Sequence, residues 1–349
     1  MAGHEKRPLV TVLGASGLLG TAIARELASQ PIRLRLVGRR PTAVPARRQA
    51  EVEVRTVDLT EPGAVAAAVA DADAVIHLVA YITGPSTWRV AATDPVAERV
   101  NLGLVEDLVR AIAASRPARP PVVLFAGSMS QLGRPSAARI DGTEVDAPLT
   151  AYDQQKLAAE QILQAATEEG VIRGATLRLA TLYSQGIDSA MLDRGVVAAM
   201  TRRAFADQPL TMWHTGTVTR DLLCIDDAAR AFVAALDQEQ AVTGRHWLVG
   251  TGVATSVAEL FGMIAKVVST HTGRPAVPVL SVSPPKHSAE TDLIDYVLDP
   301  AVFEAATGWS ARVPLMHGLD GLAAAIARET ATNAGETAAD LIATAERGS

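Results

Sequence analysis

The sequence predicts an α/β fold, in which a doubly wound parallel sheet is followed by a smaller lobe. Two observations carry this prediction. Short apolar runs rich in β-branched residues alternate with alanine-rich helical stretches through the first half of the chain, and a glycine-rich turn joins the first run to the first helix. Because crossovers between parallel strands are right-handed, this alternation places helices on both faces of one sheet.

The expected elements follow in chain order. Strands are expected at residues 9–13, 33–37, 52–57, 74–79, 122–126 and 175–179. Helices are expected at residues 18–29, 62–70, 94–115 and 151–169. After Tyr183 the connections lengthen and prolines become frequent, which indicates a change of organisation.

This change divides the chain into three parts. We expect a first domain over residues 1–185, a smaller lobe over 186–328, and a flexible or helical tail over 329–349. Residues 220–236 are expected to return to the first domain. The lobe would lie over the carboxyl ends of the strands, where α/β folds bind ligands.

Composition excludes several classes of protein. With 38 acidic and 32 basic residues the net charge is −6, which disfavours nucleic acid and anionic membranes as partners. Cys224 is the single cysteine, so an intrachain disulfide and a thiolate metal cluster are both excluded. No apolar stretch precedes the first strand, and no uncharged apolar run reaches the ~18 residues of a spanning helix. We expect a cytoplasmic protein without a metal site.

The glycine-rich turn predicts a site for a dinucleotide. Its sequence is Gly14-Ala15-Ser16-Gly17-Leu18-Leu19-Gly20. Backbone N–H groups and a helix N-terminus in such a turn can hold a pyrophosphate. Gly14 and Gly17 would let the backbone approach the phosphates, and Gly20 would let the helix pack close to the strand. Glycine clusters also serve ordinary turns, but the position inside a βαβ unit favours the dinucleotide.

The end of the second expected strand predicts NADPH rather than NADH. NAD-binding folds commonly carry an acidic residue there for the adenosine ribose, whereas this chain has Gly38 followed by Arg39 and Arg40. Two guanidinium groups suit a 2′-phosphate, with Ser16 as a further neighbour. The alternative is that both arginines belong to a solvated basic loop.

Two more strand ends face the expected cofactor. Asp58 and Leu59 close the third strand, where the carboxylate can accept from the adenine amino group; capping the following helix is its alternative role, and both can hold. His77 ends the fourth strand. We interpret it as a core imidazole rather than a catalytic base, and nothing near it supplies metal-ligand spacing.

Three residues predict hydride transfer to or from a carbonyl group. Ser128 follows the fifth strand, and Tyr152 and Lys156 lie one helical turn apart. Hydride addition to a ketone creates an alkoxide, so a proton must reach the oxygen. The ammonium group is expected to lower the pKa of the phenol, and Ser128 to donate a hydrogen bond to the substrate oxygen.

These motifs resemble the extended short-chain dehydrogenase/reductases over residues 8–328. Within that family the chain is more similar to the NDP-4-keto-6-deoxyhexose 4-ketoreductases of antibiotic deoxysugar pathways. The stretches that carry the closer similarity are Leu78-Val79-Ala80-Tyr81, Ser86-Thr87-Trp88-Arg89, Ala97-Glu98-Arg99-Val100-Asn101, Met212-Trp213-His214 and Thr307-Gly308-Trp309.

The resemblance implies a Rossmann-type NADP-binding domain over 1–185 and a sugar-nucleotide lobe over 186–328. It implies a dTDP-linked 4-keto-6-deoxyhexose as substrate and a homodimer as the assembly. The cofactor site would also include Val79, Ala80, Tyr81 and Asn101, together with Tyr152 and Lys156.

The resemblance also implies where the substrate binds. Besides Ser128 and Tyr152, the substrate residues would be Trp88, Trp213 and Arg220. Arg220 would clamp the diphosphate, the alternative being an ion pair with Asp221. Trp213 would stack on the base, or serve the core instead.

We therefore expect NADPH-dependent reduction of the C4 ketone, with Tyr152 as the acid, Ser128 orienting the oxygen, and Lys156 tuning Tyr152 and holding the nicotinamide ribose. Met129 and Ser130 stand where related 4,6-dehydratases carry an Asp-Glu pair, which argues against dehydration. One alternative is a sugar-nucleotide 4-epimerase, which keeps NAD through its cycle. Another is a non-catalytic NAD(P)-sensing regulator, although such proteins commonly lack the Tyr/Lys pair.

Overall fold

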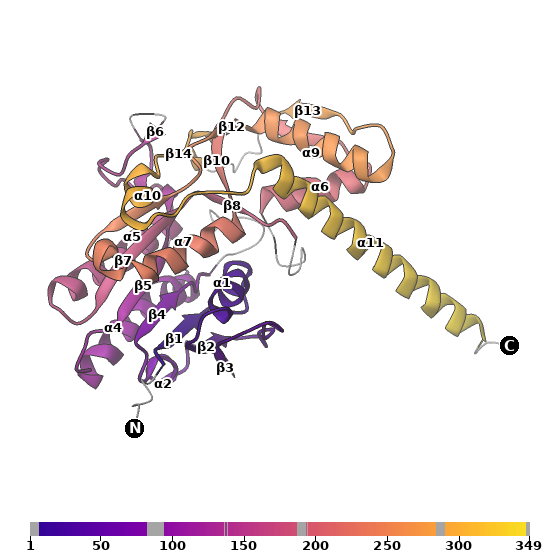
Figure 1. The fold of residues 1–349 in the computed structure, drawn as a ribbon. Coiled ribbons are helices and arrows are strands. Elements are labelled where there is room, and N and C mark those ends of the chain that lie inside the picture. Colours follow the sequence, from indigo (N-terminus) through magenta and orange to yellow (C-terminus); the bar gives the residue numbers. More distant parts are fainter. Residues whose placement is uncertain are drawn as a thin grey trace. The chain divides into compact units, whose positions relative to one another are not determined.

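The computed structural model describes residues 7–81, 94–135, 137, 139–186, 193, 195–283 and 290–346 (Figure 1). The chain divides into two compact units, each built from three segments. The first unit consists of Met1–Leu182, Val218–Thr255 and Lys286–Arg312, and the second of Tyr183–Thr217, Ser256–Pro285 and Val313–Ser349.

The first unit contains a seven-stranded sheet whose neighbouring strands are all parallel. Its order is β11-β7-β5-β4-β1-β2-β3. The bounds are β1 (Leu9–Leu13), β2 (Arg33–Gly38), β3 (Glu51–Thr56), β4 (Ala74–His77), β5 (Val122–Ser128), β7 (Arg173–Leu179) and β11 (His246–Val249). From β1 the chain builds outward to β3 and then crosses back to β4 on the other side of β1. The doubly wound fold is confirmed, and its switch point lies between β1 and β4.

Helices cover both faces of this sheet. Their bounds are α1 (Leu18–Ala28), α2 (Ala64–Val69), α3 (Pro95–Glu98), α4 (Leu104–Ser115), α5 (Ala151–Glu168) and α7 (Ile225–Asp237). Helices α1 and α7 pack together on one core, and α2, α4 and α5 share the other. The helix expected at 94–115 is interrupted by a π-helical turn, η2 (Arg99–Gly103).

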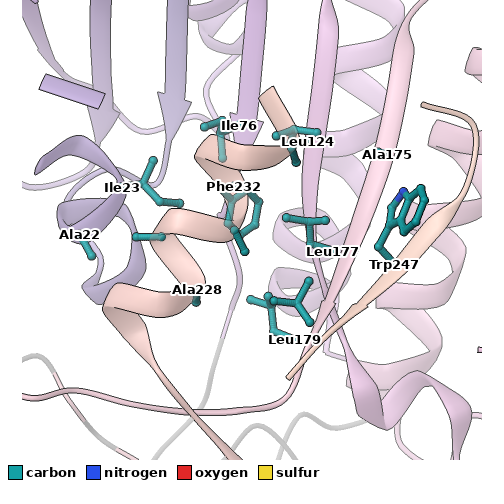
Figure 2. Packing of buried hydrophobic residues seen from close by; sticks show 14 of the residues in the cluster. Ala22, Ile23, Ile76, Leu124, Ala175, Leu177, Leu179, Ala228, Phe232 and Trp247 are labelled. Carbon is teal, nitrogen blue, oxygen red and sulfur yellow. The ribbon is translucent and has the colours of Figure 1, made fainter. Parts of the chain in front are cut away.

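The core beneath α1 and α7 shows why these helices form here. Figure 2 shows Ile23 of α1 and Phe232 of α7 directed toward Ile76 of β4 and Leu124 of β5. All four side chains are fully buried. Burying an aliphatic or aromatic side chain of this size stabilises the fold by about 1.5–3 kcal/mol.

The return of the chain to the first unit differs in detail from the expectation. Residues 220–236 form most of strand β10 (Thr219–Cys224) and helix α7, and neither joins the large sheet. The strand that does is β11, which follows α8 (Glu239–Val242). Strand β10 lies between β12 (Ala254–Ser256) and β8 (Thr181–Tyr183) in a small separate sheet.

The remaining elements are short, except in the second unit. In the first unit they are β6 (Arg139–Ile140), β14 (Val297–Leu298), α10 (Ala301–Thr307) and two 3₁₀ turns, η3 (Met129–Leu132) and η5 (Glu290–Leu293). The second unit holds α6 (Val196–Phe205), β9 (Leu210–Trp213), α9 (Val257–Thr272), β13 (Val279–Val282) and α11 (Leu315–Glu346). Strands β9 and β13 pair in parallel, and α6, α9 and α11 pack on one another. In the described part of the chain, no helix is long and apolar enough to span a membrane.

Candidate active site

The glycine-rich turn joins β1 to α1 in a conformation that only small residues allow. Gly14 has a positive φ of 91°. A Cβ on Gly20 would lie 2.3 Å from the Gly14 carbonyl oxygen, so α1 can start this close to the strand only with glycine there. Gly17 caps α1 without a side-chain hydrogen bond, which leaves the first amides of the helix uncapped by any side chain. This cradle fits the phosphates of a dinucleotide.

The end of β2 carries no acidic side chain. A Cβ on Gly38 would lie 2.6 Å from the Ser16 hydroxyl oxygen. Arg40 donates to the backbone oxygen of Ser16 over 3.1 Å, and both Arg39 and Arg40 are exposed. The ribose-binding carboxylate of NAD-binding folds therefore has no equivalent at this position, while two guanidinium groups stand beside the turn.

The Asp58 carboxylate accepts hydrogen bonds from a residue close to it in the sequence. Its Oδ1 accepts from the backbone N–H and the hydroxyl of Thr60, over 2.9 and 2.8 Å. These bonds lower the pKa of Asp58, and the charges of Arg39 and Arg99 lower it further. Asp58 is thus a carboxylate near neutral pH, as both of its expected roles require. Leu59 beside it is buried.

The segment after β4 is tied to helix α5 through Asn101. The Asn101 side chain accepts from the Tyr81 N–H over 2.7 Å and donates to Gln155 over 2.8 Å. Asn101 is fully buried in the π-helical turn. Val79 and Ala80 are half-buried just before Tyr81. The bond to Gln155 had no signal in the sequence.

His77 is a neutral, buried side chain. Burial lowers its pKa to about 3, with a further contribution from the charge of Lys156. Its ring lies 5.7 Å from the ring of Phe125, and neither ring nitrogen has a hydrogen-bond partner among the described residues. A core role matches this environment, because an imidazole with so low a pKa takes up a proton poorly near neutral pH.

Strand β5 and helix α5 bring Ser128, Tyr152 and Lys156 to the same edge of the sheet. Ser128 is the last residue of β5, and the other two lie in the first turns of α5. The Lys156 ammonium group donates to the Ala126 carbonyl oxygen over 2.9 Å, which fixes it against β5. It lies 4.5 Å from the Phe125 ring centroid and 5.9 Å from that of Tyr152.

The pKa of Tyr152 differs from the expectation. The phenol is buried, and burial raises its pKa, as does the charge of the neighbouring Asp153. The ammonium group of Lys156 was expected to act in the opposite direction, but it is directed at β5. Burial also lowers the pKa of Lys156 to about 7.

A chain of hydroxyl groups connects Ser128 to a buried carboxyl group that the sequence interpretation overlooked. The Ser128 and Ser130 hydroxyls are 2.7 Å apart, and Ser130 donates to Asp153 over 2.5 Å. Asp153 also accepts from the Thr150 hydroxyl over 2.6 Å. In the sequence, Ser130 indicates only that the glutamate of related 4,6-dehydratases is absent. Its partner lies 23 positions away, so no local pattern reveals the pair.

A second network holds the backbone of Ser128. The Ser128 N–H donates to the Gln131 side chain over 2.7 Å, and Gln131 donates to Glu160 over 3.0 Å. Glu160 pairs with Arg178, which also donates to both carboxylate oxygens of Asp146. Burial alone would raise the pKa of Glu160, but hydrogen bonds from His246 and Arg178 lower it to about 2. Glu160 is therefore ionised near neutral pH.

The expected substrate residues are distributed over both units. The Arg220 guanidinium in the first unit donates to the carbonyl oxygens of Thr219, Ile294 and Asp292, and burial lowers its pKa. Asp221 accepts from Thr251 instead. Trp213 ends β9 in the second unit and is half-buried. Trp88 lies outside the described residues.

The buried ammonium group predicts how stability depends on pH. The pKa of Lys156 is about 7 in the fold and 10.5 as the model value, so the unfolded chain binds the extra proton between these values. Stability contributed by this site should rise with pH across that window, by up to ~1.4 kcal/mol per pH unit. We expect the free energy of unfolding of the wild type, relative to Lys156→Met, to increase between about pH 7 and pH 9 in urea titrations. Parallel pH curves for the two proteins would contradict it.

Fold and site together have the features of the α/β proteins that bind a dinucleotide and carry out redox chemistry beside it. A parallel doubly wound sheet carries a glycine turn after β1 and a Tyr/Lys pair on the helix after β5. The chain belongs to the NAD dependent epimerase/dehydratase family, whose model matches residues 10–250.

Two curated proteins are similar over nearly their whole lengths. The dTDP-L-rhamnose 4-epimerase of Burkholderia thailandensis is 24% identical, with 92% of this chain and 95% of that protein covered. The dTDP-6-deoxy-L-talose 4-dehydrogenase (NAD(P)(+)) of Kitasatospora kifunensis is 26% identical, with 91% and 95% covered.

Solved structures share the fold. UDP-glucose 4-epimerase from Thermotoga maritima, determined with UDP-glucose, superimposes with a TM-score of 0.77 at 19% identity and covers 92% of this chain and 99% of that one. UDP-glucuronic acid 4-epimerase from Bacillus cereus, in complex with UDP-glucuronic acid and NAD, gives 0.74 at 21% identity, with 92% and 99% covered.

Proposed function

We propose that this chain is a sugar-nucleotide 4-epimerase that oxidises and re-reduces C4 of a dTDP-linked hexose with a nicotinamide dinucleotide. The observation that carries the proposal is the similarity, over nine tenths of each chain, to a dTDP-L-rhamnose 4-epimerase and a dTDP-6-deoxy-L-talose 4-dehydrogenase. Both names locate the reaction at position 4 of a dTDP-linked sugar. The NADPH-dependent ketoreduction expected from the sequence has weaker support than this alternative.

The site supports the chemistry of such a cycle. When bound, a nicotinamide ring would accept a hydride from C4 and return it to the ketone. Tyr152 would exchange the proton of the C4 oxygen, and Ser128 would hold that oxygen in place. Lys156 is anchored to Ala126 and would hold the nicotinamide ribose. The turn between β1 and α1 would hold the phosphates of the dinucleotide.

One observation favours a second candidate, the reduction of a 4-ketosugar by NADPH. Gly38 supplies no ribose-binding carboxylate beside Ser16, and Arg39 and Arg40 follow it with two guanidinium groups. These groups suit the 2′-phosphate of NADPH. A 4-dehydrogenase running in reverse is a 4-ketoreductase, so the relatives accommodate this candidate as well.

Cofactor analysis combined with product analysis distinguishes the candidates. We expect the purified protein to retain NAD and to convert dTDP-L-rhamnose into its C4 epimer without added cofactor, as followed by NMR. Rapid NADPH oxidation with a dTDP-4-keto-6-deoxyhexose, and no epimer from the alcohol, would replace the first candidate by the second. Failure of both reactions across sugar nucleotides would support a non-catalytic dinucleotide sensor.

A further inference from the structure

A buried carboxyl group, that of Asp153, is connected to the hydroxyl of Ser128 through the hydroxyl of Ser130. Ser128, Ser130 and Asp153 form a continuous chain of hydrogen bonds, with oxygen–oxygen distances of 2.7 and 2.5 Å. Asp153 is 0% exposed, and Thr150 donates to its other oxygen over 2.6 Å. The backbone N–H of Ser130 donates to the Ser128 hydroxyl over 3.3 Å.

When Asp153 is ionised, the direction of donation is fixed in both hydrogen bonds that link it to Ser128. A carboxylate can only accept, so the single hydroxyl proton of Ser130 goes to Asp153. The contact between the two serine hydroxyls then requires Ser128 to donate to Ser130. Ser128 has no further proton. Toward a bound sugar it can only accept a hydrogen bond.

When Asp153 is protonated, both hydrogen bonds can be donated in the opposite direction. A neutral carboxyl group can donate to the oxygen of Ser130, and Ser130 can then donate to Ser128. The hydroxyl proton of Ser128 becomes available to the sugar. A C4 ketone needs such a donor, because its oxygen carries no proton, whereas a C4 hydroxyl group can donate to an accepting Ser128.

We propose that Asp153 is a positioning residue that determines whether Ser128 binds the alcohol or the ketone form of the sugar. The ionised carboxylate makes Ser128 an acceptor matched to the alcohol, and the neutral acid makes it a donor matched to the ketone. The inference rests on the proposed function, since a reaction at C4 passes through both forms. Tyr152 keeps its role as the group that exchanges a proton with the sugar oxygen, so the C4 hydroxyl group turns its single proton from Ser128 to Tyr152 before it is oxidised.

Burial and hydrogen bonding act in opposite directions on the pKa of Asp153, and the pKa lies above its ordinary value. Burial raises its pKa, against the hydrogen bonds from Ser130 and Thr150, which lower it. The titratable side chains that respond to its charge are Tyr152 on the same helix and Tyr296 before β14; the charge raises the pKa of both. The turn η3 that packs against it contributes no ionisable side chain.

Binding measurements test the inference without turnover. In a Tyr152→Phe background, dissociation constants are measured by calorimetry for a dTDP-6-deoxyhexose and its 4-keto form between about pH 5 and pH 9. We expect the preference for the alcohol over the ketone to grow with pH, by up to about tenfold per pH unit while Asp153 ionises. Adding Asp153→Asn should make that preference independent of pH.

Two further variants separate this role from a structural one. Ser130→Ala leaves Asp153 in place but breaks its connection to Ser128, so the pH dependence should disappear as in Asp153→Asn. Thr150→Val removes a hydrogen bond that stabilises the carboxylate but lies off the path, so the transition should persist and move to higher pH. Circular dichroism checks that each variant is folded, because Thr150 also caps α5.

Each outcome is decisive. An unchanged pH dependence in Asp153→Asn overturns the inference while leaving the proposed function intact. A pH dependence lost in Asp153→Asn but kept in Ser130→Ala also overturns it, because the carboxylate would then act by another route. A wild-type protein that neither binds nor converts any sugar nucleotide overturns the proposed function, and the inference with it.

Discussion

Tyr152→Phe is expected to lower turnover on the order of 10²–10⁴-fold, the range for loss of a general acid–base group. The phenol is buried at the start of α5, and Phe preserves its packing while removing the one oxygen that can exchange a proton. Burial and the charge of Asp153 raise the pKa of this group, so its resting form is the neutral phenol, which can donate a proton in the reduction half of the cycle. Turnover is measured on the sugar nucleotide at saturating concentration.

A matched control removes the phenol oxygen of a different buried tyrosine, Tyr183. Tyr183 is also buried, at the end of β8, and Tyr183→Phe should change turnover far less. Retention of the dinucleotide by Tyr152→Phe, measured after gel filtration, shows that the loss is chemical and not a loss of cofactor. Turnover of Tyr152→Phe near the wild-type value would remove this phenol from the mechanism.

Most strands of the sheet could be predicted because they are buried on both faces, whereas β3 is a largely exposed edge strand. Strands buried on both faces are continuous apolar runs, and β1 coincides with the run at residues 9–13. Strand β11 was missed because it lies beyond Tyr183, where the alternation of strands and helices that identified the other strands ends. The π-helical turn around Asn101 was missed because its side-chain spacing in the sequence resembles that of an ordinary helix, and only the backbone bonds distinguish the two.

The candidate site was predictable as far as local spacing reaches. Helical spacing places Tyr152 and Lys156 on one face, and the position of Ser128 follows from where β5 ends. The pKa shifts and the contact between Ser130 and Asp153 depend on tertiary burial and on pairs far apart in the chain, which spacing cannot supply. The catalytic and binding roles of these residues stay predictions until variants are measured.

The buried Arg178 carries the second large expected effect, this time on stability. Arg178→Met should lower the free energy of unfolding by about 3–5 kcal/mol, the cost of removing one partner from a buried ion pair. The guanidinium is 1% exposed and binds Glu160 and Asp146, so its loss leaves the 8% exposed Glu160 carboxylate without its main counter-charge. Urea unfolding at neutral pH measures the change.

An arginine-to-methionine substitution at an exposed ion pair gives the control, and a second substitution at Glu160 tests the cause of the stability loss. Arg139 pairs with Asp299 over 3.1 Å with its side chain 56% exposed, and Arg139→Met should lower the free energy of unfolding far less than Arg178→Met. If an unpaired buried charge causes the loss, adding Glu160→Gln to Arg178→Met should recover part of the stability. Equal losses at the two arginines would contradict this account. Glu160 also binds Gln131, which in turn binds the backbone of Ser128. Arg178→Met should therefore lose turnover as well, whereas Arg139→Met should not.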